Sequence, residues 1–587
     1  MGNETMARMR CAEALVRALE LEGVRHVFGH PGHGNTNILD AIYDSSQIDF
    51  KLTRHEQAAA HIADGYARIS GDIGVCCASV GPGPANMVMG LASAAAASSP
   101  VVAIFGGVIS RWVGRGQLQE TSPFYGLPDQ SFVQVLQPVV KKVWQVQHPD
   151  LIPEIVRKAC ALARAGNPGP VAIEIPWDLQ AAFHEFDDIP NPGQFSYARR
   201  VRAEAQAVAR AADALHRAST PVIVAGYGAV LADAGAEILE LAEKLGAPVA
   251  TSYAAKGIVA EDHPLSLGNV GWLGHPNAHE MIREHADVVL AVGFSFSDLS
   301  TCWWTEGMPF VKQNRFIQID IDANQIGRTY PVEVGLLGDA KATLQETIGA
   351  LSAKGAPPAR KENLELTAKV KSGFRMEVPG EESDAQGMEP LRVVEELRRF
   401  LPKDILFSLD TGDHNHYFGA FFPIYSPRRL LYPGGWTPMG FGPTSIIGGK
   451  LARPDLPAVC VTGDGGFLMV CQEVITAVEW GLPVIWVVFN NQTLGAIRGG
   501  QLASYGGRVI GTEFCENADY AALARSLRAE GLTVSRYAEI EDAIGHALAC
   551  GRPCVVDMRI ARDPAPPPIA GMWFEPERDE IPPRPRS

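Results

Sequence analysis

The stretch Pro457-Ala-Val-Cys-Val-Thr-Gly-Asp-Gly-Gly466 leads a short run of β-branched residues into two glycines and an aspartate. A second such run, 482–489, leads into Asn490-Asn491. Between them, apolar residues recur at helical spacing: Val470, Val474, Ala477 and Val478. The order predicts a βαβ unit with one helix over 467–480. Both polar clusters would then lie at the carboxyl ends of adjacent parallel strands, where open α/β sheets bind ligands.

The residue types in these clusters suit a diphosphate held by a hard cation. Gly465 and Gly466 let the backbone approach phosphate oxygens at a helix start, where backbone amides favour anions. Asp464 and Asn491 offer oxygen ligands of the kind that Mg²⁺ takes beside phosphate oxygens and water. A Gly-Asp-Gly turn alone also occurs in ordinary Rossmann-like domains, and it is the paired asparagine that favours the cation site.

This Gly-Asp-Gly and Asn-Asn spacing resembles the signature of thiamine diphosphate enzymes. The resemblance implies that Asp464, the Asn491 side chain and the Thr493 carbonyl hold Mg²⁺. It also implies further cofactor contacts beside Gly465 and Gly466, at Pro31, Asn86, Gly412, Asp413, His414, Leu494 and Gly495. Met439 aligns with the bulky apolar residue that wedges between the two cofactor rings in these enzymes, although a methionine in the protein core is the alternative.

A second motif lies near the start of the chain. Thr53-Arg-His-Glu-Gln57, followed by Gly65-Tyr-Ala-Arg68, resembles the pyrimidine-binding domain of acetolactate synthase, benzoylformate decarboxylase and benzaldehyde lyase. The resemblance implies that Glu56 hydrogen-bonds the pyrimidine ring nitrogen and exchanges a proton with it, which generates a C2 carbanion on the cofactor. On local evidence alone, Glu56 could instead be a carboxylate that stabilises a helix N-terminus.

Two further residues are candidates for proton transfer. His33 ends the loop Gly29-His-Pro-Gly-His33, and a histidine can shuttle protons near neutral pH; a surface histidine without a role is the alternative. Gln119 matches the active-site glutamine of acetolactate synthase, with Leu118 in place of an aromatic residue, and a plain polar loop is its alternative. The catalytic candidates are therefore Glu56, His33 and Gln119.

The substrate pocket is predicted after the asparagines. The resemblance to benzoylformate decarboxylase there implies that Ala496 and Ile497 line the pocket, with Leu118. Gly500 replaces an aromatic residue found in relatives, so we expect more room than a pocket for pyruvate alone needs. Arg498 could attract an acidic substrate or simply face solvent.

Composition sets broad limits on the function. The chain has 587 residues, 46% hydrophobic and 20% charged, which is typical of a globular protein with several domains. The net charge of −15 argues against nonspecific nucleic-acid or anionic-membrane binding. No apolar run approaches the roughly 20 residues that span a bilayer. The N-terminus lacks a signal-peptide core, and the ten cysteines match no zinc spacing, so we expect a cytoplasmic protein.

Strands alternate with helices along the chain, which predicts an α/β protein with parallel sheets. The resemblance implies three Rossmann-like domains in order: pyrimidine-binding (1–185), central (200–350) and diphosphate-binding (387–563). The segment 351–386 is predicted to be a linker and 564–587 a C-terminal tail. In the central domain, Ser295 stands where FAD-binding relatives have an arginine, so FAD is possible but disfavoured.

The resemblance implies a thiamine diphosphate- and Mg²⁺-dependent 2-oxo acid decarboxylase or carboligase that acts through a C2 carbanion and an enamine. The alternatives are an acyloin C–C lyase, an FAD-containing oxidase of the same architecture, and an inactive regulatory paralogue. The family also implies a homodimer or homotetramer, because the cofactor lies between the pyrimidine-binding domain of one chain and the diphosphate-binding domain of another.

Overall fold

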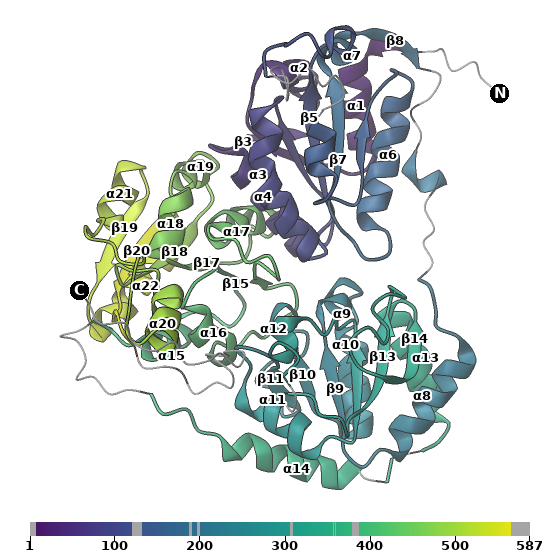
Figure 1. Cartoon of the computed structure of the whole chain (residues 1–587), viewed down its shortest axis with the longest axis vertical. Helices are drawn as coiled ribbons and strands as arrows, with labels where there is room; N and C mark the ends of the chain where they lie inside the picture. Colours follow the sequence, from purple (N-terminus) through teal and green to yellow (C-terminus); the bar gives the residue numbers. More distant parts are fainter. Residues whose placement is uncertain are drawn as a thin grey trace. The chain divides into compact units, whose positions relative to one another are not determined.

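The computed structural model describes residues 7–119, 132–186, 189, 191–195, 200–305, 309–355, 357–358, 360–378, 387–564 and 567. Contacts divide the chain into two compact units. Figure 1 labels the helices and strands of the chain. The first unit comprises Met1–Ala198, Pro433–Asp455 and Val470–Leu482, and the second comprises Arg199–Tyr432, Leu456–Met469 and Pro483–Ser587. In the described part of the chain, no helix is long and apolar enough to cross a membrane.

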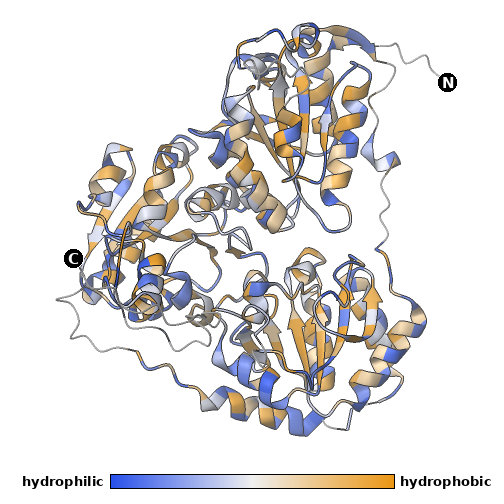
Figure 2. Cartoon of the chain, in the orientation of Figure 1, coloured by the Kyte–Doolittle hydropathy of each residue, from blue (hydrophilic) through white to orange (hydrophobic). Residues whose placement is uncertain are grey.

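The first unit is built on a sheet of six parallel strands in the order β3-β2-β4-β5-β7-β6. The strands are β2 (His26–Gly29), β3 (Asp49–Leu52), β4 (Gly74–Ala78), β5 (Val101–Gly107), β6 (Val143–Gln145) and β7 (Val171–Pro176). A short antiparallel pair, β1 (Ala7–Arg10) and β8 (Phe183–Phe186), lies apart from this sheet. Figure 2 shows the strands of the sheets mostly in the hydrophobic colour, as expected for parallel sheets buried on both faces.

Helices cover both faces of this first sheet, because alternate residues of each strand point to opposite faces. Val75 and Cys77 of β4 share a core with α1 and α6, whereas α3 and α4 pack together on the other side (Figure 1). The helices are α1 (Cys11–Leu21), α2 (Thr36–Tyr43), α3 (Glu56–Ser70), α4 (Pro82–Ala96), α5 (Phe132–Leu136), α6 (Leu151–Arg164) and α7 (Trp177–Ala181). Cys76 and Cys77 of β4 are both fully buried in the protein core.

The second unit contains two more sheets of six parallel strands. The sheet of the central region has the order β11-β10-β9-β12-β13-β14, and its strands are β9 (Pro221–Ala225), β10 (Val249–Thr251), β11 (Ser266–Asn269), β12 (Val288–Val292), β13 (Arg315–Asp320) and β14 (Val332–Leu337). Its helices are α8 (Ala205–Arg217), α9 (Tyr227–Leu231), α10 (Gly235–Leu245), α11 (Pro276–Glu280), α12 (Asp298–Thr301) and α13 (Ala340–Ser352). Helices α8, α10 and α13 share one core with this sheet, and α11 shares the other.

The predicted linker, 351–386, contains a helix, α14 (Arg360–Gly373). Asn363 is buried, and its amide donates hydrogen bonds to the carbonyls of Pro221 (3.3 Å) and Gly246 (2.9 Å). Val370 joins the core beneath β9 and β12. This part of the predicted linker is therefore packed on the central sheet, which charged composition did not indicate; residues 379–386 lie outside the described residues.

The third sheet has the order β16-β15-β17-β18-β20-β19. Its strands are β15 (Leu406–Leu409), β16 (Leu430–Leu431), β17 (Ala458–Gly463), β18 (Val484–Asn490), β19 (Glu530–Val534) and β20 (Cys554–Arg559). The helices of this region are α15 (Pro390–Phe400), α16 (Asn415–Phe421), α17 (Phe441–Ala452), α18 (Asp464–Val470), α19 (Glu473–Glu479), α20 (Gly495–Ser504), α21 (Tyr520–Ser526) and α22 (Ile540–Ala549). When the strands of each sheet are numbered along the chain, the first and third sheets have the same strand order, 2-1-3-4-6-5.

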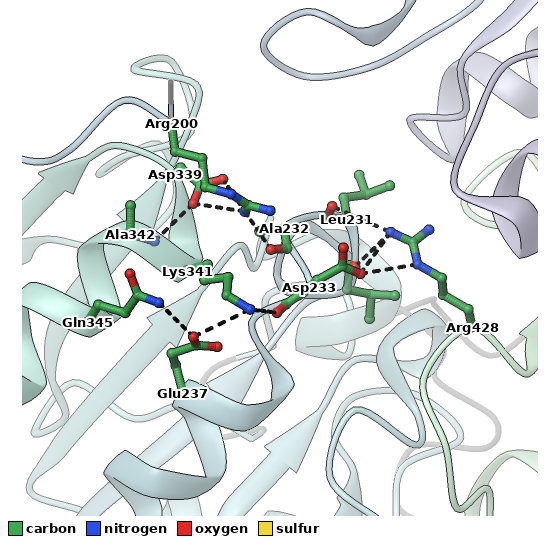
Figure 3. A network of polar contacts seen from close by, with 11 residues as sticks. Arg200, Leu231, Ala232, Asp233, Glu237, Asp339, Lys341, Ala342, Gln345 and Arg428 are labelled. Atoms are coloured by element: carbon green, nitrogen blue, oxygen red, sulfur yellow. Dashed lines mark hydrogen bonds and ion pairs between the residues drawn. The ribbon is translucent and has the colours of Figure 1, made fainter. Parts of the chain in front are cut away.

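A polar network joins the edge of the third sheet to the central region within the second unit (Figure 3). Arg428, just before β16, donates to the carbonyl of Val230 and to the carboxylate of Asp233, each at 3.2 Å. On the other side, Arg200 donates to the Ala232 carbonyl at 2.6 Å and pairs with Asp339. These contacts hold the loop after α9 from both sides.

The helix predicted over 467–480 is two helices, α18 and α19, separated at residues 471–472. At the junction, two backbone hydrogen bonds join residues three apart, as in a 3₁₀-helix, where an α-helix joins residues four apart. The Val474 N–H donates to the Cys471 carbonyl and the Ile475 N–H to the Gln472 carbonyl. By its contacts α19 belongs to the first unit, as does α17. Helix α17 crosses α3 closely, since a Cβ at Gly65 would overlap the carbonyl oxygen of Ser445.

Candidate functional site

Asp464 joins the two halves of the motif that opens the sequence. Oδ1 accepts a hydrogen bond from the backbone N–H of Gly465 and Oδ2 from that of Gln492, both at 2.8 Å. Strands β17 and β18 are parallel neighbours, so the ends of both strands meet at one edge of the sheet. The βαβ geometry predicted from the sequence is confirmed for these strands.

The Asp464 carboxylate is 2% exposed, and burial raises its pKa to about 6, with the nearby Asp557 carboxylate adding to the rise. Asn491 is buried beside Asp464, and its Oδ1 accepts from the Thr493 N–H at 3.3 Å. Within the described residues, no group of three or more His, Cys, Asp or Glu side chains could hold a metal. One carboxylate beside amide and carbonyl oxygens is the kind of protein ligand set that Mg²⁺ takes when phosphate and water supply its other ligands.

The two asparagines have different environments. The Asn490 amide donates to Oδ1 of Asp557 at 2.8 Å, a buried contact between β18 and β20. Asn491 lies beyond the strand, where its amide faces Gly495: a Cβ built on Gly495 would lie 3.0 Å from Asn491 Nδ2 and 3.3 Å from Asp413 Oδ2. Asn490 is thus structural, and only Asn491 is available to the candidate site.

The predicted cofactor contacts at 412–414 follow β15, which pairs with β17, so they lie at the same sheet edge. Asp413 reaches Gly495 as above, and its Oδ1 bonds His416 Nδ1 at 2.6 Å. His414 is buried, with Nε2 2.8 Å from the Asp410 carbonyl oxygen, and burial lowers its pKa to about 4. A Cβ on Gly412 would lie 2.8 Å from the His414 ring. His414 is therefore a neutral residue that shapes this loop.

Asp410 is a residue of this site that the sequence analysis missed. It is fully buried, and Thr462 Oγ1 donates to its Oδ2 at 3.0 Å. A Cβ on Gly466 would overlap that same oxygen. The glycine at 466 is thus required by a carboxylate inside the protein, in addition to any approach of phosphate. The position of Asp410 directly after a buried strand was the available signal.

The loop and helix after the asparagines are anchored to a neighbouring segment. Thr493 Oγ1 and Leu494 N–H both donate to the Thr512 carbonyl at 2.8 Å. In α20, Ile497 is exposed, and Ala496 and Gly500 are half-buried. Arg498 is mostly buried and is ion-paired with Asp563, with Glu513 3.6 Å away. The Arg498 side chain therefore neither faces solvent nor awaits an acidic substrate, because its guanidinium group already lies against two carboxylates of the chain.

Glu56 is the first residue of α3 in the first unit. The helix is capped by His55, whose Nδ1 accepts from the Gln57 N–H at 3.1 Å. Asn86 donates from Nδ2 to Oε2 of Glu56 at 2.9 Å. The other oxygen, Oε1, faces Gly83, where a built Cβ would lie 3.7 Å away. Glu56 is half-buried, with one oxygen held by Asn86 and one facing a residue without a side chain.

The loop that carries Pro31 and His33 follows β2 at the carboxyl edge of the first sheet. Buried Asn35 holds it: Oδ1 accepts from the Gly32 N–H at 2.9 Å and Nδ2 donates to the His30 carbonyl at 3.2 Å. Gly34 N–H donates to Ser79 Oγ, after β4, at 3.0 Å. These hydrogen bonds hold the loop to the end of β4, and His33 and Pro31 are exposed.

Gln119 and Leu118 are exposed. Gln119 has a left-handed backbone (φ 61°), and its carbonyl oxygen would lie 2.6 Å from a Cβ on Gly81. Gly81 precedes α4, the helix that carries Asn86. Gln119 therefore packs on the loop that leads to the partner of Glu56. Met439, also in the first unit, is half-buried beside Gly440.

The predicted site residues thus form two groups. The first unit holds Glu56, Asn86, His33, Pro31, Gln119, Leu118 and Met439, and the second holds Asp464, Gly465, Gly466, Asn491, Thr493, Leu494, Gly495, Ala496, Ile497, Gly500, Gly412, Asp413 and His414. The structure brings Glu56 to Asn86, and Asp464 and Asp413 to the loop that follows β18.

Three family models match the chain in the predicted order. They are described as "Thiamine pyrophosphate enzyme, N-terminal TPP binding domain" over residues 9–127, the central domain over 208–347 and the C-terminal TPP binding domain over 410–558. The chain is 36% identical to the probable acetolactate synthase large subunit of Methanococcus aeolicus, covering 94% of this chain and 92% of that one. It is 34% identical to the acetolactate synthase of Arthrospira platensis (95% and 96%) and 32% to the acetolactate synthase isozyme 3 large subunit of Escherichia coli (strain K12) (92% and 93%).

Proposed function

The chain belongs to the thiamine pyrophosphate enzymes, and on that premise we propose that it is a Mg²⁺-dependent 2-oxo acid decarboxylase or carboligase. The observation that carries the proposal is the bond from the Gln492 N–H to the buried Asp464 carboxylate, because it joins the two halves of the motif that would form the cation site. Thiamine diphosphate, when bound, supplies a nucleophilic carbanion at its thiazolium C2, which can attack the carbonyl carbon of a 2-oxo acid or an acyloin.

The residues of this chain have distinct parts in that chemistry. Asp464, Asn491 and the Thr493 carbonyl would hold Mg²⁺ against the diphosphate, with Asp413 and Gly495 beside them. Glu56 would carry the proton exchanged with the pyrimidine ring nitrogen. Since Asn86 occupies Oε2, Oε1 is the oxygen that would carry it.

His33 and Gln119 are proposed to move protons to and from the substrate. Both belong to the carboxyl edge of the first sheet, His33 after β2 and Gln119 against the loop that starts α4. Leu118, Ala496, Ile497 and Gly500 would line the substrate pocket, and Met439 would shape the cofactor. An enzyme of this kind is expected to be a homodimer or homotetramer, which gel filtration would reveal.

We propose that the central region disfavours the binding of FAD. In the central sheet, strand order reverses between β9 and β12, where such sheets bind dinucleotides. The loops after these strands are in backbone contact: Gly228 N–H donates to the Gly293 carbonyl at 3.1 Å, and a Cβ on Gly226 would overlap that oxygen. Flavin absorbance in the purified protein would contradict this proposal and favour an oxidase.

The test is a panel of 2-oxo acids and acyloins, assayed with thiamine diphosphate and Mg²⁺. Release of CO₂ from 2-oxo acids, with an aldehyde or a 2-hydroxy ketone as product, supports the proposal. Turnover of acyloins alone would favour a C–C lyase. Binding of the cofactor without turnover of any substrate would favour a regulatory paralogue.

A further inference from the structure

A buried carboxylate outside the cofactor motifs faces the segment that presents Glu56. Glu473 is the first residue of α19 and is 1% exposed. It accepts hydrogen bonds from the backbone N–H of Arg54, at 3.0 Å to Oε1 and 3.3 Å to Oε2, and from Thr476 Oγ1 at 2.7 Å. The backbone N–H of His55 is a further donor to this carboxylate.

The two backbone donors immediately precede Glu56. Thr53, before them, is held by β2: its N–H donates to the Gly29 carbonyl at 2.9 Å. The turn between β3 and α3 is therefore fixed by β2 at one end and by Glu473 at the other. A carboxylate that accepts from backbone N–H groups forms hydrogen bonds about twice as strong as neutral ones, so this contact is well suited to fixing a backbone.

We propose that Glu473 is a positioning residue for Glu56: it fixes the Arg54–His55 backbone and thereby the direction from which Glu56 meets the pyrimidine ring nitrogen. The inference rests on the proposed function, in which Glu56 handles that proton. Burial raises the pKa of Glu473 to about 7, because the carboxylate is removed from water beside the turn.

The same helix offers a matched control. Glu479 is also ion-paired with Arg54, but through the guanidinium group, and its side chain is 45% exposed. Glu473→Gln and Glu479→Gln make the same change of charge on one helix. Only the first alters the acceptor of the Arg54 and His55 backbone N–H groups. A general effect of charge would appear in both variants, and a positioning effect only in the first.

The first experiment measures amide hydrogen exchange by mass spectrometry on the full chain without added cofactor. In Glu473→Gln we expect a peptide covering residues 53–57 to exchange about tenfold faster, because an acceptor is weakened. Peptides from β5 and β7 should be unchanged, as should every peptide of Glu479→Gln. Equal protection of 53–57 in Glu473→Gln and the wild type would overturn the inference.

The second experiment follows deuterium exchange at C2 of added thiamine diphosphate by NMR, together with steady-state kinetics. We expect Glu473→Gln to slow C2 exchange and kcat about tenfold, with KM within about twofold. Thr476→Val, which removes only the hydroxyl donor, should have a smaller effect of the same kind and replaces Glu473→Gln if that variant fails to fold.

The two failures are distinguishable through Glu56→Gln. If Glu56→Gln slows C2 exchange while Glu473→Gln and Thr476→Val do not, the positioning role is wrong and the proposed function stands. If Glu56→Gln has no effect, the proposed role of Glu56 fails and the positioning inference, which depends on it, fails too.

Discussion

Oδ2 of Asp464 accepts a hydrogen bond from the backbone N–H of Gln492 at 2.8 Å, although the two residues belong to different strand–loop junctions. The loop after β18 is therefore held by the residue that would bind the cation. Loss of this carboxylate should disturb both the loop geometry and the charge at the site.

Asp464→Asn tests this relationship. An amide places N–H against one of the two backbone donors and removes the charge that a cation needs, at a cost of about 1–3 kcal/mol. We expect thiamine diphosphate to bind about tenfold or more weakly at fixed Mg²⁺, measured by isothermal titration calorimetry. Removal of Mg²⁺ with a chelator should bring wild type and variant to similar weak affinities. Unchanged affinity with Mg²⁺ present would exclude Asp464 from the cation site.

Glu56→Gln should separate cofactor binding from cofactor activation. The amide cannot exchange a proton with the pyrimidine nitrogen, so we expect C2 deuterium exchange to slow by roughly 10²–10⁴-fold. Affinity for thiamine diphosphate should change only a few-fold, since the diphosphate site is intact. Asn86→Ala, which removes the 2.9 Å bond to Oε2, should give a smaller loss in the same assay. Exchange at the wild-type rate in Glu56→Gln would refute the assignment.

Gly466→Ala should destabilise the protein, because its methyl group would overlap the Asp410 carboxylate. Overpacking of this kind typically costs about 1–3 kcal/mol. The matched control is Gly545→Ala in α22, where a Cβ meets nothing within 4 Å and helix propensity favours alanine by about 1 kcal/mol. Thermal unfolding at one scan rate should show a lower Tm for the first variant and an equal or higher Tm for the second. A wild-type Tm for Gly466→Ala would disprove the close approach.

Gly500→Phe should restore the bulk that relatives have in the predicted pocket. We expect kcat/KM for a large aromatic 2-oxo acid to fall about tenfold or more relative to pyruvate, as overpacking costs about 1–3 kcal/mol. Leu502→Phe, on the same helix, is the control and should leave this ratio unchanged. Equal loss in both variants would indicate a general disturbance of α20 instead of a pocket lining.

Stability should depend on pH through Glu473. Burial raises its pKa from 4.5 to about 7, so the folded state holds the proton more tightly than the unfolded state does. Its contribution is present in full below about pH 4.5 and is lost as pH rises through 7, a change of up to about 3 kcal/mol. We therefore expect the wild type to lose stability relative to Glu473→Gln between about pH 4.5 and 7, measured by urea unfolding. A change in the opposite direction would contradict the raised pKa.

The sequence alone predicted the elements and the motif residues, because these depend on local patterns. The β-branched runs before Gly463 and before Asn490 were expected to be adjacent parallel strands, with the Gly-Asp-Gly and Asn-Asn clusters at one sheet edge, and β17 and β18 are such a pair. The local reading of Glu56 as a carboxylate at a helix N-terminus also agrees with its place as the first residue of α3. These features follow from the periods of strands and helices and from the turn preferences of single residues.

Only the tertiary structure decided which residues meet across long separations. The carboxylate that holds the Arg54 backbone lies 419 residues away in the sequence, and the oxygen that requires glycine at 466 belongs to Asp410. The same holds for the packing of α14 on the central sheet and for the different roles of Asn490 and Asn491. No local pattern encodes these contacts, because each depends on buried polar groups finding partners only once separate strands and helices have packed together.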